Sequence, residues 1–211
     1  TLFGLDRTHT AAVIEMGMSH QGEISRMSMC CQPDVCVITN IGVSHIENLG
    51  SQANILKAKM EILDGAKYDA PLILCRDDKL LAKAEVYSDR KVYYYSVSKK
   101  DCDVYATGIT TADGGINFTI NYGGEKLAAR INCLGEHNVK NALAAFCVGI
   151  ALDIPTEDII KGIGLFKPEG MRQNVREHKG VTFILDCYNA APDSMKASLS
   201  VLAQTEAKGK R

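Results

Sequence analysis

The 211-residue sequence predicts an α/β fold in which a mostly parallel sheet is flanked by helices. In the first hundred residues, short apolar runs typical of buried strands alternate with helical patterns, which favours a parallel sheet covered on both faces. Between residues 104 and 133 the pattern changes to alternating strands separated by glycine-containing turns. This change predicts a small antiparallel β insert, because such turns connect hairpins.

The parallel part is expected to begin near residue 9. Apolar runs predict buried strands over HTAAVIEMG (9–17), PDVCVITNIG (33–42), APLILC (70–75) and KVYYYSV (91–97). Helical patterns occupy 22–31, 51–66 and a stretch between the last two strands. The helix at 51–66 has Ser51 as its expected N-cap and a glycine near its end.

The rest of the chain predicts the insert, two helices and the start of another unit. The turns of the insert fall at 113–115 and 123–124, where Asp-Gly-Gly and Gly-Gly accept positive φ. Helices are expected over 138–153 and 156–166, the second with Thr156 as its cap. A strand at 181–190 and a helix at 193–207 then indicate one unit of a further α/β domain. We therefore expect a central domain over 1–170 and the beginning of a second, Rossmann-like domain over 171–211.

Composition excludes several classes of protein. Apolar residues make up 46% and charged residues 23%, which is ordinary for a globular chain. The 24 basic and 25 acidic residues give a net charge of −1, so no basic excess favours nucleic acid or an anionic membrane. The sequence contains neither a transmembrane run nor a signal-peptide pattern, and its eight cysteines form no CxxC pair. We expect a cytoplasmic protein with reduced thiols, no nucleic-acid partner, no membrane insertion and a monomeric state.

Lys59 is the most informative candidate residue. On a helical wheel it falls near the middle of an apolar stripe formed by Ile55, Leu56, Met60, Ile62 and Leu63. One interpretation is a lysine whose stem crosses the edge of the core to reach water. The other is a desolvated lysine with a lowered pKa and a reactive neutral amine.

Polar residues at strand ends and at one helix start form a second group of candidates. Glu15 closes the first predicted strand and His45 follows the second, where α/β sheets bind ligands. The two side chains could share a magnesium ion and nucleotide phosphates, or they could be ordinary loop hydrogen-bonders. Asn138 and Asn141 lie three residues apart on a helix, so both amides could face one point, or Asn138 could simply cap the helix. The sequence contains no GxxxxGK[ST] phosphate loop.

Five segments, taken in order, resemble the Mur ligases, which are cytoplasmic ATP-dependent enzymes that form amide bonds in the peptidoglycan precursor. The segments are EMGMSHQGEI (15–24), TNIGVSHIENLGS (39–51), ILKAKMEI (55–62), LGEHNVKNALAA (134–145) and ILDCYNAAPDSM (184–195). SHQGEI and the YNAAP stretch are similar to the branch that adds D-alanyl-D-alanine to UDP-N-acetylmuramoyl-tripeptide. The resemblance covers essentially the whole chain and implies a P-loop-NTPase-like central domain.

The resemblance implies a role for each matching residue. Glu15 and His45 would hold two Mg²⁺ ions, and Lys59 would act with them as a carbamylated, metal-binding catalytic residue. The residues implied for ATP binding are His137, Asn138, Asn141, Arg172 and Asp186. The residues implied for substrate binding are Ser19, His20, Glu23, Asn40, Tyr188 and Asn189. Ala191 and Met171 depart from the usual pattern of the family.

The chemistry implied is acyl-phosphate formation followed by amine attack. The γ-phosphate of ATP would pass to the terminal carboxylate of the muramoyl tripeptide, and the amine of D-alanyl-D-alanine would then displace phosphate. The chain would be a fragment without the N-terminal domain, the phosphate loop and most of the C-terminal domain, and inactive alone. Two alternatives stay open: another Mur-type ligase (diaminopimelate- or lysine-adding, or cyanophycin-synthetase-like), and a non-catalytic binding module of the same fold.

Overall fold

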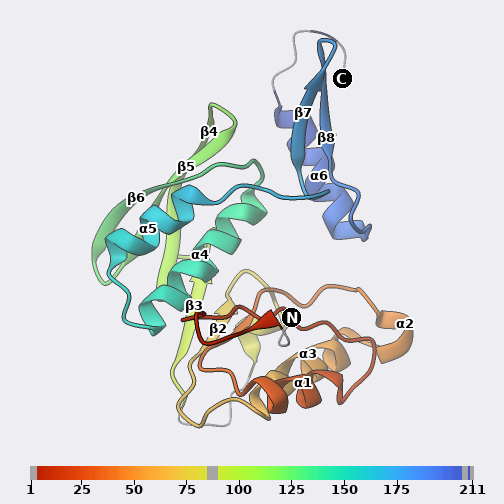
Figure 1. Ribbon diagram of the computed structural model, residues 1–211, viewed down its shortest axis with the longest axis vertical. Helices are drawn as coiled ribbons and strands as arrows, with labels where there is room; N and C mark the ends of the chain where they lie inside the picture. Colours follow the sequence, from red (N-terminus) through yellow and green to blue (C-terminus); the bar gives the residue numbers. More distant parts are fainter. Residues whose placement is uncertain (1–3, 85–89, 206–208, 210–211) are drawn as a thin grey trace.

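The computed structural model describes residues 4–84, 90–205 and 209, and a six-stranded sheet forms its centre (Figure 1). The strands follow one another across the sheet in chain order. They are β1 Cys36–Ile38, β2 Leu72–Cys75, β3 Val92–Ser96, β4 Val104–Ala112, β5 Gly115–Tyr122 and β6 Glu125–Ile131. Neighbours from β1 to β4 are parallel, whereas β4, β5 and β6 pair antiparallel. The predicted fold class is confirmed, and the antiparallel strands continue the parallel sheet because β4 pairs with β3.

The two turns of the antiparallel part have the expected backbone. Asp113 and Gly114 have φ angles of 49° and 69°, and Gly123 and Gly124 have φ angles of 58° and 85°. These values place both turns in the left-handed region that tight hairpins require. The hairpin positions were therefore readable from the turn residues alone.

Helices pack on the sheet and around its β1 end (Figure 1). They are α1 Glu23–Cys31, α2 Ile46–Leu49, α3 Gln52–Met60, α4 Glu136–Ala151 and α5 Thr156–Leu165, with 3₁₀ turns η2 Glu61–Leu63 and η3 Leu81–Lys83. A further helix, α6 Pro192–Gln204, belongs to the C-terminal unit (Figure 1). α4 packs against β2 through β6, α5 lies against α4 and β6, and α1 packs against α3 and η2. No helix in the described part of the chain has both the length and the apolar character that a membrane crossing requires.

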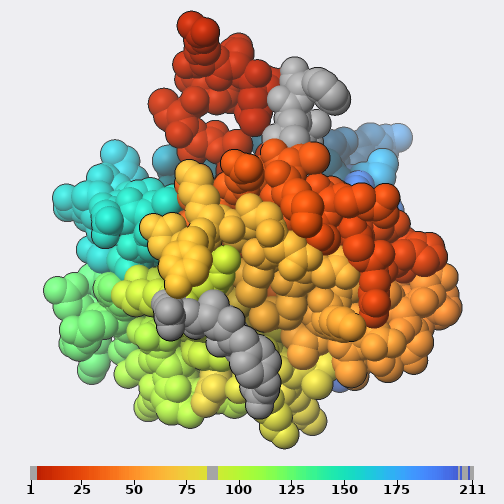
Figure 2. All heavy atoms as spheres, turned by 90° about the horizontal axis from the view of Figure 1, so that it is seen from below, coloured from red at the N-terminus to blue at the C-terminus, as the bar shows by residue number. Residues whose placement is uncertain are grey.

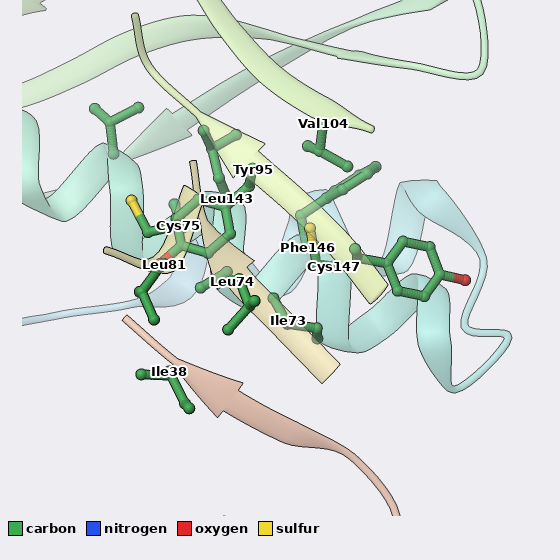
Figure 3. Close-up of a cluster of buried hydrophobic side chains, with 14 of the residues drawn as sticks. Ile38, Ile73, Leu74, Cys75, Leu81, Tyr95, Val104, Leu143, Phe146 and Cys147 are labelled. Atoms are coloured by element: carbon green, nitrogen blue, oxygen red, sulfur yellow. The ribbon is translucent and has the colours of Figure 1, made fainter. Parts of the chain in front are cut away.

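The core lies between β2, β3 and α4 (Figure 3). All four residues of β2 are buried, and successive side chains of a strand point to opposite faces, so β2 is covered on both faces. Tyr95 of β3 and Phe146 of α4 are fully buried beside it. The Phe146 ring also meets Tyr122 of β5 edge to face, with ring centroids 5.7 Å apart. This apolar layer sets the position of the loops that leave the ends of β1, β2 and β3.

The strand predicted over residues 9–17 is wrong. This segment has no regular secondary structure, and Val13 is 94% exposed. Figure 2 shows the N-terminal segment, in red, standing out from the body of the molecule. Within the described residues β1 pairs only with β2, so residues 9–17 have no partner strand. An apolar run without a partner strand has no ladder to hold it extended.

Several predicted element boundaries also need correction. α3 ends at Met60 and tightens into η2, so the helix predicted over 51–66 is shorter, although Ser51 does cap it by accepting a hydrogen bond from the Asn54 amide. Thr156 is not a cap, because it is the first helical residue and Pro155 holds the N-cap position. Between β2 and β3 the described residues contain only the short η3, and residues 85–89 and 206–207 of the predicted helices lie outside the described residues.

The C-terminal unit contains a strand that the sequence did not indicate. β7, Asn174–His178, pairs antiparallel with β8, Val181–Leu185, and α6 follows (Figure 1). The turn between the strands is Lys179-Gly180, with φ angles of 50° and 76°. β7 has the polar sequence NVREH and is mostly exposed, so it shows no apolar pattern. Its strand conformation depends on pairing with β8.

Gly65 lies where η2 meets α1, and this contact requires glycine. A β-carbon at Gly65 would lie 2.2 Å from the Met29 amide nitrogen and 2.2 Å from the Ser28 carbonyl carbon. The same region is joined by hydrogen bonds, since the Ser28 hydroxyl donates to the Ile62 carbonyl at 2.5 Å and accepts from the Gly65 amide at 3.2 Å. The close approach positions the end of the Lys59 helix against α1.

Replacing Gly65 with alanine should therefore destabilise the fold. The β-carbon would press on backbone atoms, which cannot rotate away, and we expect Gly65→Ala to lower the free energy of unfolding by about 1–3 kcal/mol. Gly162→Ala is the matched control, because a β-carbon there meets nothing within 4 Å. In the helix α5, that substitution should raise stability by about 0.5–1 kcal/mol. Urea unfolding checks both, and an unchanged midpoint for Gly65→Ala would contradict the close packing.

Candidate functional site

Two adjacent carboxylates, Asp77 and Asp78, tie together the loops at the carboxyl ends of the parallel strands. Asp78 accepts hydrogen bonds from the backbone amides of Ile41, after β1, at 2.7 Å and of Leu80 at 2.9 Å. Asp77 accepts from the Ser96 hydroxyl at 2.5 Å and from the Val97 amide at 2.9 Å, both at the end of β3. Burial raises the pKa of Asp77, but these hydrogen bonds to its charged form outweigh burial and hold the pKa below its ordinary value.

Lys59 lies half-buried on α3 and points to the loop that follows β1. Its Nζ donates to the Asn40 carbonyl oxygen at 2.7 Å and lies 3.4 Å from the Asn40 side-chain oxygen. Burial lowers the pKa of the Lys59 amine, and the nearby Asp78 carboxylate opposes part of this shift. The desolvated interpretation of Lys59 is thus supported over a lysine that reaches into open water. Asn40, expected to touch substrate, contacts Lys59.

His45 and Glu15, the other two expected metal ligands, are both exposed. His45 precedes α2 with a φ of 62°, and Glu15 lies in the irregular segment before α1. Across the described residues, no three His, Cys, Asp or Glu side chains gather where they could hold a metal ion. The metal assignment of Glu15, His45 and Lys59 therefore stays a prediction.

The expected substrate-binding residues Ser19, His20 and Glu23 lie together before and in the first turn of α1. The Glu23 carboxylate accepts from the Ser19 amide at 2.6 Å and from the His20 amide at 3.1 Å. His20 Nδ1 also lies 3.7 Å from the Glu23 carboxylate. The two backbone hydrogen bonds lower the pKa of Glu23. Glu23 therefore shapes this loop, whatever else it binds.

His137, Asn138 and Asn141 form a connected group in the first turns of α4. The Asn138 side-chain amide donates to the Leu134 carbonyl at 2.7 Å, and Asn141 donates to the Asn138 side-chain oxygen at 3.4 Å. The N-cap position belongs to Gly135, so Asn138 is not the cap, and the convergence of the two amides on one ligand stays a prediction. Burial lowers the pKa of His137, with the Asp186 charge acting in the opposite direction.

Gln173 joins that group to the C-terminal unit. Its side-chain oxygen accepts from Asn138 at 2.9 Å, and its side-chain nitrogen lies 3.0 Å from His137 Nε2. Its backbone amide donates to Asp186 at 3.3 Å, and Asp186 also accepts a hydrogen bond from Ser198. The structure thus brings Asp186 close to the α4 residues with which it was grouped.

The remaining predicted residues of the C-terminal unit lie near one another on its surface. The Arg172 guanidinium stacks over the Tyr188 ring, 4.2 Å from the ring centroid. The Asn189 side-chain oxygen accepts from the neighbouring Ala190 amide at 2.8 Å. These contacts are local, and they leave the ligand roles of Arg172, Tyr188 and Asn189 as predictions.

A cavity of about 550 Å³ lies between α4 and α5. Apolar side chains such as Val148, Ile159 and Phe166 form its walls, and the polar residues that line it are Asn138, Asn141 and Asp158. Pockets of this size and composition hold small molecules, with the few polar groups setting orientation.

Sequence reasoning missed Asp77, Asp78, Gln173 and Glu61, whose carboxylate contacts the start of α1. For the two aspartates a signal was present, because paired carboxylates just beyond the end of an apolar strand can accept the amides of neighbouring loops. Gln173 and Glu61 bond to residues more than 30 positions away, and no local pattern marks them.

Comparison with known proteins gives one consistent family. The Mur ligase middle domain family matches residues 1–149. The UDP-N-acetylmuramoyl-tripeptide–D-alanyl-D-alanine ligase of Bacillus subtilis strain 168 is 39% identical over 212 residues, which cover 100% of this chain and 45% of that protein.

Solved structures agree. MurF from Acinetobacter baumannii matches with a TM-score of 0.90 and 34% identity, over 97% of this chain and 45% of that one. MurF from Thermotoga maritima in complex with ADP matches with a TM-score of 0.79 and 27% identity, over 90% of this chain and 44% of that one. This chain spans less than half the length of each of these relatives. The family match over most of the chain, together with the shared fold, establishes that this chain belongs to the Mur ligase family.

Proposed function

We propose that this chain forms the nucleotide- and metal-binding centre of an ATP-dependent ligase that joins D-alanyl-D-alanine to UDP-N-acetylmuramoyl-tripeptide through an acyl phosphate. ATP and two Mg²⁺ ions would be its cofactors, residues 1–170 its central domain and residues 171–211 the start of its C-terminal domain. The observation that carries the proposal is Lys59, a half-buried amine held 2.7 Å from the Asn40 carbonyl at the carboxyl end of β1. This is the sheet edge where α/β proteins bind ligands.

The environment of Lys59 suits carbamylation. Only a neutral amine captures carbon dioxide, and burial lowers the pKa of this amine. The product would carry a carboxylate, which with the Glu15 carboxylate and the His45 imidazole gives a donor set acceptable to a divalent cation. Bound Mg²⁺ would stabilise the negative charge of the phosphoryl group and of the tetrahedral intermediate.

The other residues of the chain would bind and orient the reactants. The loop of Ser19 and His20, held by Glu23, would receive the UDP-linked peptide. The amides of Asn138 and Asn141, which line the cavity beside α4, would bind the adenine. Arg172 and Asp186 would bring the C-terminal unit to the nucleotide, and Gln173 already links Asp186 to the α4 group.

Two alternatives are another Mur-type ligase and a non-catalytic binding module. A chimera separates them: the matching segment of the Bacillus subtilis ligase is replaced by this chain, and ligation is assayed with D-alanyl-D-alanine, diaminopimelate and lysine. We expect ATP-dependent ligation of D-alanyl-D-alanine. Ligation of a single amino acid instead would favour the other ligases. A folded chimera that binds ligands without turnover would favour the binding module.

In that chimera, substitutions of Lys59 test the carbamate. Lys59→Ala removes the metal-binding group and should lower kcat by about 10²–10³-fold, the usual cost of losing one group that stabilises developing charge. Lys59→Arg should fail almost as badly, because guanidinium stays protonated and cannot capture carbon dioxide. Small carboxylic acids should restore part of the rate of the alanine variant.

The control for this series is Lys57→Ala, an exposed position on the same helix, which should keep normal turnover. Steady-state kinetics measures all three variants. Near-normal turnover of Lys59→Arg would show a structural lysine and would rule out the carbamate.

The chain itself can be tested through the pH dependence of His137. Since burial lowers the pKa of folded His137, the unfolded chain binds more protons between that value and about 6.5. Stability should therefore rise with pH through this window and level off above it. Urea unfolding from pH 5 to 8 should show the rise in the wild type and in the exposed control His178→Gln, and a smaller rise in His137→Gln. An NMR titration that placed the pKa of His137 above 6.5 would contradict the prediction.

A further inference from the structure

We propose that Glu61 is a positioning residue. From the start of η2, directly after the helix α3 that carries Lys59, it holds the substrate loop, residues 19–22, in place. The proposal rests on the proposed function, because the substrate role of Ser19 and His20 belongs to it. The structural part, a carboxylate of one element fixing the start of another, stands on contacts alone.

The start of α1 cannot cap itself. The first backbone amides of a helix have no acceptor within the helix, and a Ser, Thr, Asp or Asn side chain at the N-cap usually supplies one. Here the N-cap is Gly22, with a φ of 82° and no side chain. Glu61 takes over this function: its two carboxylate oxygens each lie 2.8 Å from the Gly22 amide nitrogen, and one lies 3.4 Å from the Ser25 amide nitrogen.

The position of Glu61 in the chain links the start of α1 to the helix that carries Lys59. Glu61 begins η2, directly after α3, and stands two residues beyond Lys59 and 39 residues beyond Gly22. Where α3 passes into η2, Lys59 therefore donates to the loop after β1 while Glu61, two residues on, holds the loop before α1. The expected metal-binding lysine and the expected substrate loop are thus held by the same rigid piece of chain.

Two carboxylates, those of Glu23 and Glu61, stabilise the substrate loop in different ways. Glu23 closes it internally by accepting the Ser19 and His20 amides. Glu61 anchors it externally through Gly22. Hydrogen bonds to a carboxylate are roughly twice as strong as neutral ones, and the positive end of a helix strengthens them further. Without Glu61 the loop would keep its internal shape but lose its fixed place, and substrate binding would then bear the cost of ordering it.

The expected signature is a change in substrate binding without a change in chemistry. In the chimera, Glu61→Ala should raise KM for UDP-N-acetylmuramoyl-tripeptide about five- to tenfold and change kcat and KM for ATP less than twofold. Glu61→Gln keeps one acceptor oxygen and should fall between Glu61→Ala and the wild type. Lys57→Ala, exposed on α3, should behave as the wild type.

Amide hydrogen exchange on the isolated chain tests the contact independently of catalysis. Glu61→Ala should speed exchange at Gly22 about tenfold or more, while Lys57→Ala leaves it unchanged. Unchanged amide exchange at Gly22 in Glu61→Ala would overturn the proposal. An equal fall in affinity for UDP-N-acetylmuramoyl-tripeptide and for ATP would overturn it too. A loss of kcat at unchanged KM would also overturn it, since Glu61 would then act through Lys59. If the unsubstituted chimera ligates nothing, the proposed function fails, and the exchange result still decides whether Glu61 anchors the loop.

Discussion

The burial of β2 on both faces is the constraint on which the rest of the structure depends. A strand covered by side chains on both sides must satisfy its backbone through its neighbours, here β1 and β3. Where the three strands end, the ladder stops and the following amides need other acceptors. Asp77 and Asp78, which follow β2 after Arg76, supply them to the loops of β3 and β1. The packing of the core thereby fixes the position of Asn40, which is next to Ile41. Through the hydrogen bond from Lys59 to Asn40, it also fixes the position of the Lys59 amine.

The candidate site consists of two groups of residues, and each group is held by a different part of the fold. One is the Lys59 region, between α3 and the end of β1, with the α1 loop anchored beside it by Glu61. The other is the start of α4, where His137, Asn138 and Asn141 contact one another or Gln173. A ligase that activates a carboxylate with ATP must bring nucleotide, metal and acceptor together, so the geometry between these groups matters as much as either one. Gln173 and Asp186 show how the C-terminal unit approaches the start of α4 through hydrogen bonds.

Membership of the Mur ligase family accounts for the order in which the five resembling segments follow one another along the chain. The roles of the individual residues in those segments are for experiments to decide. The matched relatives are more than twice as long as this chain. The proposals therefore concern reactants that residues outside this chain would also bind. The contacts of Lys59, Glu61, Asp78 and Gln173 belong to the chain itself, and stability and exchange measurements can test them without turnover.

Interactions between residues close together in the chain determine most of the strands, helices and hairpin turns of this protein, and the sequence therefore predicts them. Apolar runs of strand length predicted β1, β2, β3 and β8, helical periodicity predicted α1, α4 and α6, and Asp-Gly and Gly-Gly marked both hairpin turns, because these signals lie within a few residues. The helical wheel placed Lys59 on an apolar stripe but left open whether its amine reaches water, and the structure favours the desolvated amine. Tertiary structure alone decided whether residues 9–17 form a strand and whether the polar β7 does, since a strand exists only with a partner. It also decided the bonds of Glu61 to Gly22 and of Gln173 to Asn138, because a side chain's partner 35 or 39 residues away is set by packing and leaves no trace in local pattern.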